Sequence, residues 1–214
     1  MRIAAIMPIK LNNERLPGKN TMLLGGKPLL QHELLSLQKT GLTDEIYVYC
    51  SDATVCPFLP EGVQFLKRDS NLDLPTSNFT QIFEAFSKEI AADIYVYAHA
   101  TAPYITVETM RECIEAVKSG AYDSAFCAVK IQDFLWKDGE PLNFDAANLP
   151  RSQDLESVYR ETSGVYVFTK EVFETMHRRI GRKPFIKEVS FREAVDINTA
   201  EDFRLAEALE NLGK

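Results

Sequence analysis

Short apolar runs rich in β-branched and aromatic residues recur along the chain, separated by longer segments in which apolar residues return every three or four positions. The short runs are typical of buried strands, and the longer segments of amphipathic helices. Strands are predicted at residues 3–6, 45–50, 63–66, 94–98, 124–129 and 164–168. Because strand and helix alternate, we predict an α/β fold, with a doubly wound, mostly parallel sheet covered by helices on both faces.

The helical segments are marked by their periodicity and by their first residues. Leucines repeat at helical spacing over 29–37, directly after Pro28, and proline is favoured in the first turn of a helix. The same periodicity predicts helices over 82–90 and 110–117. Thr199-Ala-Glu-Asp202 resembles a capping box and predicts the start of a last helix.

One stretch, residues 131–160, breaks the alternation. It contains Asp138-Gly139, Pro141 and Pro150 among many polar residues, which fits a long substrate loop or a protruding hairpin subdomain. The chain shows no internal repeat and no linker. We therefore predict a single domain over 1–214, with 131–160 as an inserted region.

The composition limits the classes of function. With 24 basic against 31 acidic residues and a net charge of −7, the chain lacks the basic surface that broad nucleic-acid or anionic-membrane binding requires. The four cysteines form no C-x-x-C pair, so neither zinc nor disulfides are indicated. Without a signal-like apolar core or about 18 uninterrupted apolar residues, a cytoplasmic enzyme is expected.

Positive charge is concentrated on one loop that follows the first predicted strand. Lys10, Arg15 and Lys19 lie within eleven residues of an otherwise acidic chain, together with Pro17 and Gly18. Proline restricts the backbone, and glycine lets the main chain turn and approach a ligand closely. Such a loop suits a bound polyanion, and we interpret it as a site for a nucleoside triphosphate.

Two named phosphate-binding motifs do not match this loop. Asn13 stands where a Walker loop has its first glycine, and Asn20 follows Lys19 where that motif has serine or threonine. The spaced glycines of a dinucleotide-binding fingerprint are also absent. The loop therefore belongs to another type of nucleotide site.

Polar residues also follow other predicted strands, where open α/β sheets bind their ligands. Ser51-Asp52 follows the second strand, residues 99–103 follow the strand at 94–98, and Asp196-Ile-Asn198 follows a late extended run. Side chains alternate in extended backbone, so Asp196 and Asn198 present oxygens on one side, which suits Mg²⁺. The alternative is that this triplet serves only as a turn and helix cap.

The segments 7–10, 15–20 and 26–29, which read Met-Pro-Ile-Lys, Arg-Leu-Pro-Gly-Lys-Asn and Gly-Lys-Pro-Leu, resemble the signature of the CMP-sugar synthetases. That family includes the acylneuraminate cytidylyltransferases and the related Kdo enzymes. The resemblance implies a Rossmann-like sheet of the nucleotide-diphospho-sugar transferase type and transfer of CMP from CTP to the anomeric hydroxyl of a 2-keto-3-deoxy sugar acid. It also implies a homodimer, with 131–160 as substrate and dimerisation region.

The resemblance assigns roles to particular residues. Catalysis by charge neutralisation would fall to Lys10, Arg15, Lys19 and a metal held by Asp196 and Asn198. The other implied contacts are Asn20, Arg68, Ser77 and Asn78 for the nucleotide, and His99, Thr101, Lys137 and Arg151 for the carboxylated sugar. As alternatives, Ser77 or Asn78 is a simple helix N-cap and His99 is structural.

Departures from the family pattern leave other readings open. His99 replaces a glutamine, and Asn198 replaces an aspartate that would bring a charge to the metal. The acceptor could be another acidic sugar such as Kdo, or the chain could be a non-catalytic nucleotide-binding homologue. A glycosyltransferase is disfavoured because the sequence contains no Asp-x-Asp triplet. No general base is identified.

Overall fold

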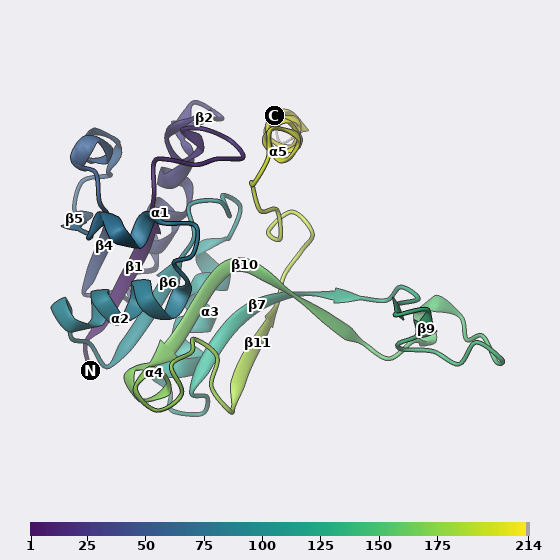
Figure 1. Ribbon diagram of the computed structural model, residues 1–214. Coiled ribbons are helices and arrows are strands. Elements are labelled where there is room, and N and C mark those ends of the chain that lie inside the picture. Colours follow the sequence, from purple (N-terminus) through teal and green to yellow (C-terminus); the bar gives the residue numbers. More distant parts are fainter. Residues whose placement is uncertain (213–214) are drawn as a thin grey trace.

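The computed structural model describes residues 1–212, and within them seven strands form one twisted sheet (Figure 1). In spatial order these strands are β11 (Pro184–Glu188), β7 (Ser124–Ile131), β10 (Val158–Thr169), β6 (Ile94–Ala98), β1 (Ile3–Ile9), β4 (Glu45–Cys50) and β5 (Gln64–Lys67). β10 runs antiparallel to both of its neighbours, whereas the other pairs are parallel. The predicted doubly wound, mostly parallel sheet is confirmed.

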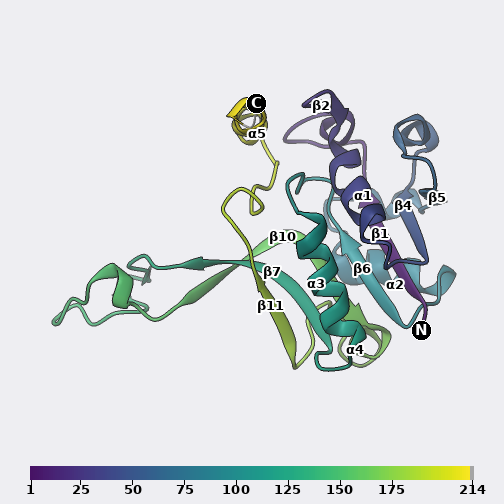
Figure 2. The ribbon, with the colours of Figure 1, turned by 180° about the vertical axis from the view of Figure 1, so that it is seen from behind.

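Helices cover both faces of this sheet (Figures 1 and 2). One face carries α1 (Leu29–Thr40) and α3 (Val107–Lys118), and the other carries α2 (Phe79–Glu89) and α4 (Lys170–Met176). α5 (Ala200–Leu212) packs over the loop that follows β1. The helices predicted from periodicity are confirmed. The prediction missed α4, which is too short to show a period, and the half-exposed edge strand β11.

Two apolar layers hold the helices to the sheet. On the α1 and α3 face the layer is mainly aliphatic, with residues such as Leu34, Val96 and Ile114. On the α2 and α4 face it is aromatic, and the Phe83 ring makes edge contacts with Tyr95 and Phe173 at 4.8 and 4.6 Å between centroids. Such pairs add to the stabilisation that comes from apolar burial.

Local sequence signals set the helix starts. The Asn78 side chain accepts a hydrogen bond from the Gln81 N–H, and the Gln81 side chain accepts one from the Asn78 N–H, so a complete capping box begins α2. Thr199 and Asp202 exchange the same pair of bonds ahead of α5. Both helix starts satisfy backbone N–H groups that would otherwise lack partners.

Between β7 and β10 the chain forms an arm that projects from the body of the molecule (Figure 1). At the base of the arm β7 and β10 stay paired, from Ala128 opposite Glu161 to Ile131 opposite Val158. Beyond this point the arm carries a hairpin of β8 (Trp136–Lys137) and β9 (Glu140–Pro141). The rest of the insertion holds a short helical turn, η4 (Ser152–Asp154). The arm-side half of β10 lacks the apolar pattern of a core strand because it leaves the body, so the predicted strand began too late.

The remaining small elements lie around the sheet. They are the helical turns η1 (Lys19–Thr21), η2 (Ala53–Phe58) and η3 (Ser70–Asp73), and the short hairpin of β2 (Leu23–Leu24) and β3 (Lys27–Pro28). Across residues 1–212, no helix combines the length and apolar character needed to cross a membrane.

Candidate active site

The loop between β1 and η1 carries the clustered cations to the carboxyl edge of the sheet. Gly18 takes a left-handed conformation with φ 69°, which glycine adopts without the strain that a side chain would bring, and η1 begins at the next residue. Lys19 is thereby turned inward and is only 9% exposed. The Asn20 amide donates to the Lys10 carbonyl at 3.0 Å and holds the loop closed.

The segment before α5 meets this loop from the far end of the chain. Lys19 Nζ donates to the Ile197 carbonyl at 2.9 Å and lies 3.4 Å from Asn198 Oδ1. Arg15 Nη2 donates to the same Asn198 oxygen at 2.8 Å. Burial lowers the pKa of Lys19, while Asp196 acts in the opposite direction. The structure thus brings the predicted cations together with Asp196 and Asn198.

A cavity of about 290 Å³ opens between these segments. Its lining includes Lys10, Arg15, Lys19, Asn13 and Asn198. Asn13 Oδ1 is buried and has no hydrogen-bond partner within the described residues. The three cations outnumber the single carboxylate of the lining, Glu14, so this cavity suits an anion.

Asp196 lies two residues before Asn198, which lines the cavity, and is held in place by hydrogen bonds. Its Oδ2 accepts hydrogen bonds from Ser163 Oγ at 3.1 Å and from Asn198 Nδ2 at 2.7 Å. Ser163 comes from the point where β10 slips register between Glu161 and Tyr166, a β-bulge-type irregularity. Irregularities of this kind often re-aim a side chain beside a functional site.

The oxygen atoms of Asp196 and Asn198 differ in how well they suit a metal. Asp196 Oδ1 is buried without a partner among residues 1–212, so it is an open carboxylate oxygen. The Asn198 oxygen is occupied by Arg15 and Lys19. Nowhere in the described part of the chain do three His, Cys, Asp or Glu side chains gather as a metal cage. This arrangement fits Mg²⁺, which is often held by one or two carboxylates plus substrate phosphates; ligation by Asn198 stays a prediction.

The predicted nucleotide contacts beyond the loop have structural partners of their own. Arg68 is 3% exposed and donates to the Ile9 carbonyl at 2.9 Å, and it forms an ion pair with Asp73. It therefore ties the end of β1 to η3. Ser77 donates to the Asn71 carbonyl at 3.3 Å, and the N-cap alternative is confirmed for Asn78. Their nucleotide roles stay predictions.

His99 and Thr101 lie at the end of β6, beside Asp196. Burial lowers the pKa of His99 to about 4, with Arg179 contributing in the same direction, so the imidazole is neutral near pH 7. Its Nε2 atom is buried without a partner among the described residues. The Thr101 carbonyl accepts the Ile197 N–H at 2.8 Å and so fixes the segment between Asp196 and Asn198 beside the end of β6.

A buried glutamate that was not predicted from the sequence supports the backbone at the end of β6. Glu33 on α1 is fully buried, and its Oε2 accepts the His99 N–H at 3.1 Å. Its Oε1 has no partner within residues 1–212. Burial raises the pKa of Glu33 well above its ordinary value, against the effect of the His99 N–H, and Asp196 raises it further. A polar residue in an otherwise leucine-rich helical stripe was the available signal.

Replacing Glu33 with glutamine should change how stability depends on pH. A folded-state pKa above the unfolded value means that stability falls as pH rises from the ordinary carboxyl pKa toward the folded one, by at most about 1.4 kcal/mol per pH unit. Glu33→Gln removes that slope. Urea unfolding between about pH 5 and pH 8 measures it. Exposed Glu207→Gln should keep the wild-type slope; an unchanged slope in Glu33→Gln would contradict the assignment.

The residues predicted to hold the sugar carboxylate lie elsewhere. Lys137 is exposed in β8, and Arg151 is exposed and pairs with Asp154 at 2.7 Å, both on the arm. Within one chain they are not brought together with the β1 loop (Figure 1). Their binding roles stay predictions.

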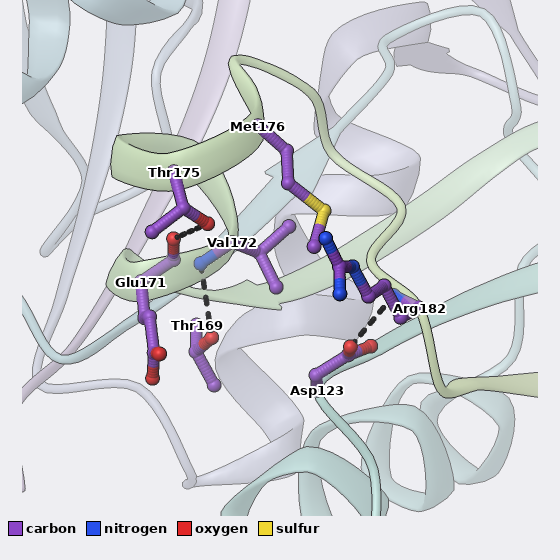
Figure 3. Close-up of a pocket in the computed structure, with 7 residues that line it drawn as sticks. All are labelled: Asp123, Thr169, Glu171, Val172, Thr175, Met176 and Arg182. Atoms are coloured by element: carbon purple, nitrogen blue, oxygen red, sulfur yellow. Dashed lines mark hydrogen bonds between the residues drawn. The ribbon is translucent and has the colours of Figure 1, made fainter.

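A second cavity, of about 370 Å³, lies near the opposite edge of the sheet, between α4 and Asp123 (Figure 3). Several of its polar groups are already engaged. Asp123 accepts N–H groups from Arg182 and Lys183, and Thr169 caps α4 through the Val172 N–H. This cavity offers no comparable set of open charged groups, and the cationic cavity is the better candidate.

Comparison with known proteins identifies the family of this chain. A family model described as cytidylyltransferase matches residues 4–213. The chain is 27% identical over 234 residues to CMP-N,N'-diacetyllegionaminic acid synthase of Legionella pneumophila, covering 100% of this chain and 98% of that protein. It is 25% identical over 215 residues to N-acylneuraminate cytidylyltransferase A of Danio rerio, covering 96% of this chain but only 50% of that protein.

Among solved structures, CMP:2-keto-3-deoxy-manno-octonic acid synthetase complexed with CTP superposes with a TM-score of 0.76. The two chains are 16% identical, and the match covers 100% of each, so it supports the fold. The family match extends over nearly the whole chain and includes both the cationic loop and the Asp196 segment. The chain therefore belongs to the cytidylyltransferase family.

Proposed function

We propose that this protein transfers CMP from CTP to the anomeric hydroxyl of a 2-keto-3-deoxy sugar acid and releases pyrophosphate. The observation that carries the proposal is the cavity in which Lys10, Arg15 and Lys19 face the Asp196 segment. The relatives named for diacetyllegionaminic acid and N-acylneuraminate support an acidic sugar as the acceptor. A Kdo-type acid remains the alternative acceptor.

The residues of this chain would act by position and charge. Lys10, Arg15 and Lys19 bind the phosphates and neutralise the charge that develops on the leaving pyrophosphate. Burial of Lys19 strengthens this effect, because less water competes for its ammonium group. We also propose that Asp196 holds Mg²⁺ through its open oxygen; when bound, the ion supplies further neutralisation and orients the phosphates.

We further propose that the protein is a homodimer and that it acts in the cytoplasm. The arm supports the homodimer. Large apolar side chains are exposed there, including Trp136 at 60% and Leu149 at 67%, and such a group of exposed apolar residues marks an interaction surface. A second copy would cover them. The cysteines are free, which fits a reducing compartment.

The experiment that tests the function is pyrophosphate release with each nucleoside triphosphate, Mg²⁺ and a panel of acids: N-acetylneuraminic, di-N-acetyllegionaminic, pseudaminic and Kdo. We expect turnover with CTP and at least one acid, loss on chelation, and recovery with Mg²⁺. Sedimentation should give twice the mass of one chain. CTP binding without pyrophosphate release for any acid would point instead to a non-catalytic homologue.

A further inference from the structure

Arg179 is a cation in the body of the protein to which the site described so far assigns no ligand. Arg179 lies in the loop between α4 and β11, and its side chain is 27% exposed. Its guanidinium carbon lies 3.6 Å from the centre of the Tyr166 ring and 5.5 Å from that of Phe79. The α4 end of this loop is tied to α2 by a hydrogen bond of 3.1 Å from Thr80 Oγ1 to the His177 carbonyl. Arg179 is therefore a positioned side chain.

The same aromatic ring places Arg179 beside the predicted sugar residue. The His99 ring packs on Tyr166 at 5.8 Å and on Tyr97 at 5.2 Å between centroids. The His99 Nε2 atom is buried without a partner among the described residues, so it can exchange a hydrogen bond with a sugar. Arg179 supplies the charge that an acidic substrate needs at this end of β6.

The guanidinium is only lightly occupied. Within residues 1–212 its sole hydrogen bond runs from Nη2 to Glu161 Oε1, at 3.3 Å. That single contact is longer than the paired bonds of a well-formed arginine–carboxylate fork, so most of its donors are open. Glu161 is itself 43% exposed and also accepts the Tyr166 hydroxyl. A weak, solvent-accessible pair is one that another carboxylate can replace.

The location also fits the reaction. Glu161 lies just before Ser163, which donates to Asp196, so the arginine pair and the metal-site carboxylate are joined through one short piece of β10. Phe79 opens α2 directly after the loop whose Pro75 lines the cationic cavity. Arg179 therefore contacts two elements, β10 and the start of α2, that lead directly to segments around that cavity.

We propose that Arg179 binds the carboxylate of the acceptor sugar and that Glu161 occupies its guanidinium until the sugar arrives. This proposal rests on the proposed function, because it names the residue of that site which selects an acid. Glu161 then serves two purposes: it keeps Arg179 in place on Tyr166, and it excludes anions that bind too weakly to displace it.

Steady-state kinetics of the full-length protein test the proposal with the fastest acid of the panel above and its methyl ester. Arg179→Gln should raise KM for the acid on the order of 100-fold, with little change in KM for CTP, because one partner of a charged pair is lost. Preference for the acid over the ester should fall by a similar factor. Arg179→Lys should recover part of it, and Glu161→Gln should lower KM for the acid.

The controls separate the possible failures. Arg178→Gln removes a neighbouring exposed arginine and should behave as wild type, and CTP affinity by calorimetry shows that each variant is folded. If the wild type turns over no acid, the proposed function fails and this proposal with it. If the wild type is active but Arg179→Gln keeps its KM and its preference for the acid, or if only Arg151→Gln loses them, the Arg179 assignment is wrong and the function stands.

Discussion

Replacing Lys19 with methionine is expected to lower kcat/KM for CTP by roughly 100- to 1,000-fold, the usual cost of removing one well-placed donor from a transition state. Methionine keeps the length and apolar part of the side chain but removes the charge. The ammonium group is buried and already bonded to the Ile197 carbonyl, so it acts at a fixed position with little competition from water. Initial rates of pyrophosphate release measure the effect.

The control for this variant is Lys39→Met, which removes an exposed positive charge from the end of α1. It should keep wild-type rates. Because Lys19 also ties the β1 loop to the segment before α5, thermal unfolding must be followed in parallel, and some loss of stability is expected. Full activity in Lys19→Met would remove the main support for nucleotide binding at this loop.

Replacing Asp196 with asparagine should lower the Mg²⁺-dependent rate by roughly 1,000-fold or more, since it removes the charge of the open oxygen while keeping the shape of the side chain. Ser163 and Asn198 can still hydrogen-bond to the remaining oxygen. Without metal, the variant should bind CTP as well as or better than wild type, because a negative charge facing the phosphates has gone. Initial rates with Mg²⁺ check the loss of activity, and calorimetry without Mg²⁺ checks the affinity for CTP.

Glu201→Gln is the matched control for Asp196→Asn. Glu201 lies close in sequence, is 76% exposed and, within residues 1–212, forms an ion pair only with Arg204, so removing its charge should leave the metal dependence unchanged. If Asp196→Asn kept the wild-type rate and the same Mg²⁺ requirement, the metal would have to be held by other residues or by the nucleotide alone.

The sequence predicted the body of the fold well, because apolar runs and helical periods are local properties. The convergence of the β1 loop on Asp196 was also predictable, since parallel strands present their carboxyl ends at one edge. The reversed direction of β10 was not, because a buried strand has the same apolar pattern in either direction. The register shift that aims Ser163 at Asp196 also left no recognisable signal in the sequence.

Side-chain partnerships were predicted less well than backbone elements. The sequence indicated that Arg68 was important, but only the fold shows it bound to the Ile9 carbonyl and Asp73. Glu33 and Arg179 meet the region around His99 from opposite faces of the sheet. Contacts between residues so far apart in the chain depend on the packing of whole elements, which a local pattern does not encode.

The opposite course of β10 has a consequence for how such a protein can diversify. In a sheet made only of parallel strands, the chain leaving β7 at the reactive edge would have to return to the far edge before entering the next strand. Here it re-enters where it left, so the excursion over 131–160 starts and finishes at the carboxyl edge of the parallel strands. Under the proposed function, lengthening or exchanging that excursion would alter acceptor choice and self-association together, while the half proposed to bind the nucleotide stays as it is.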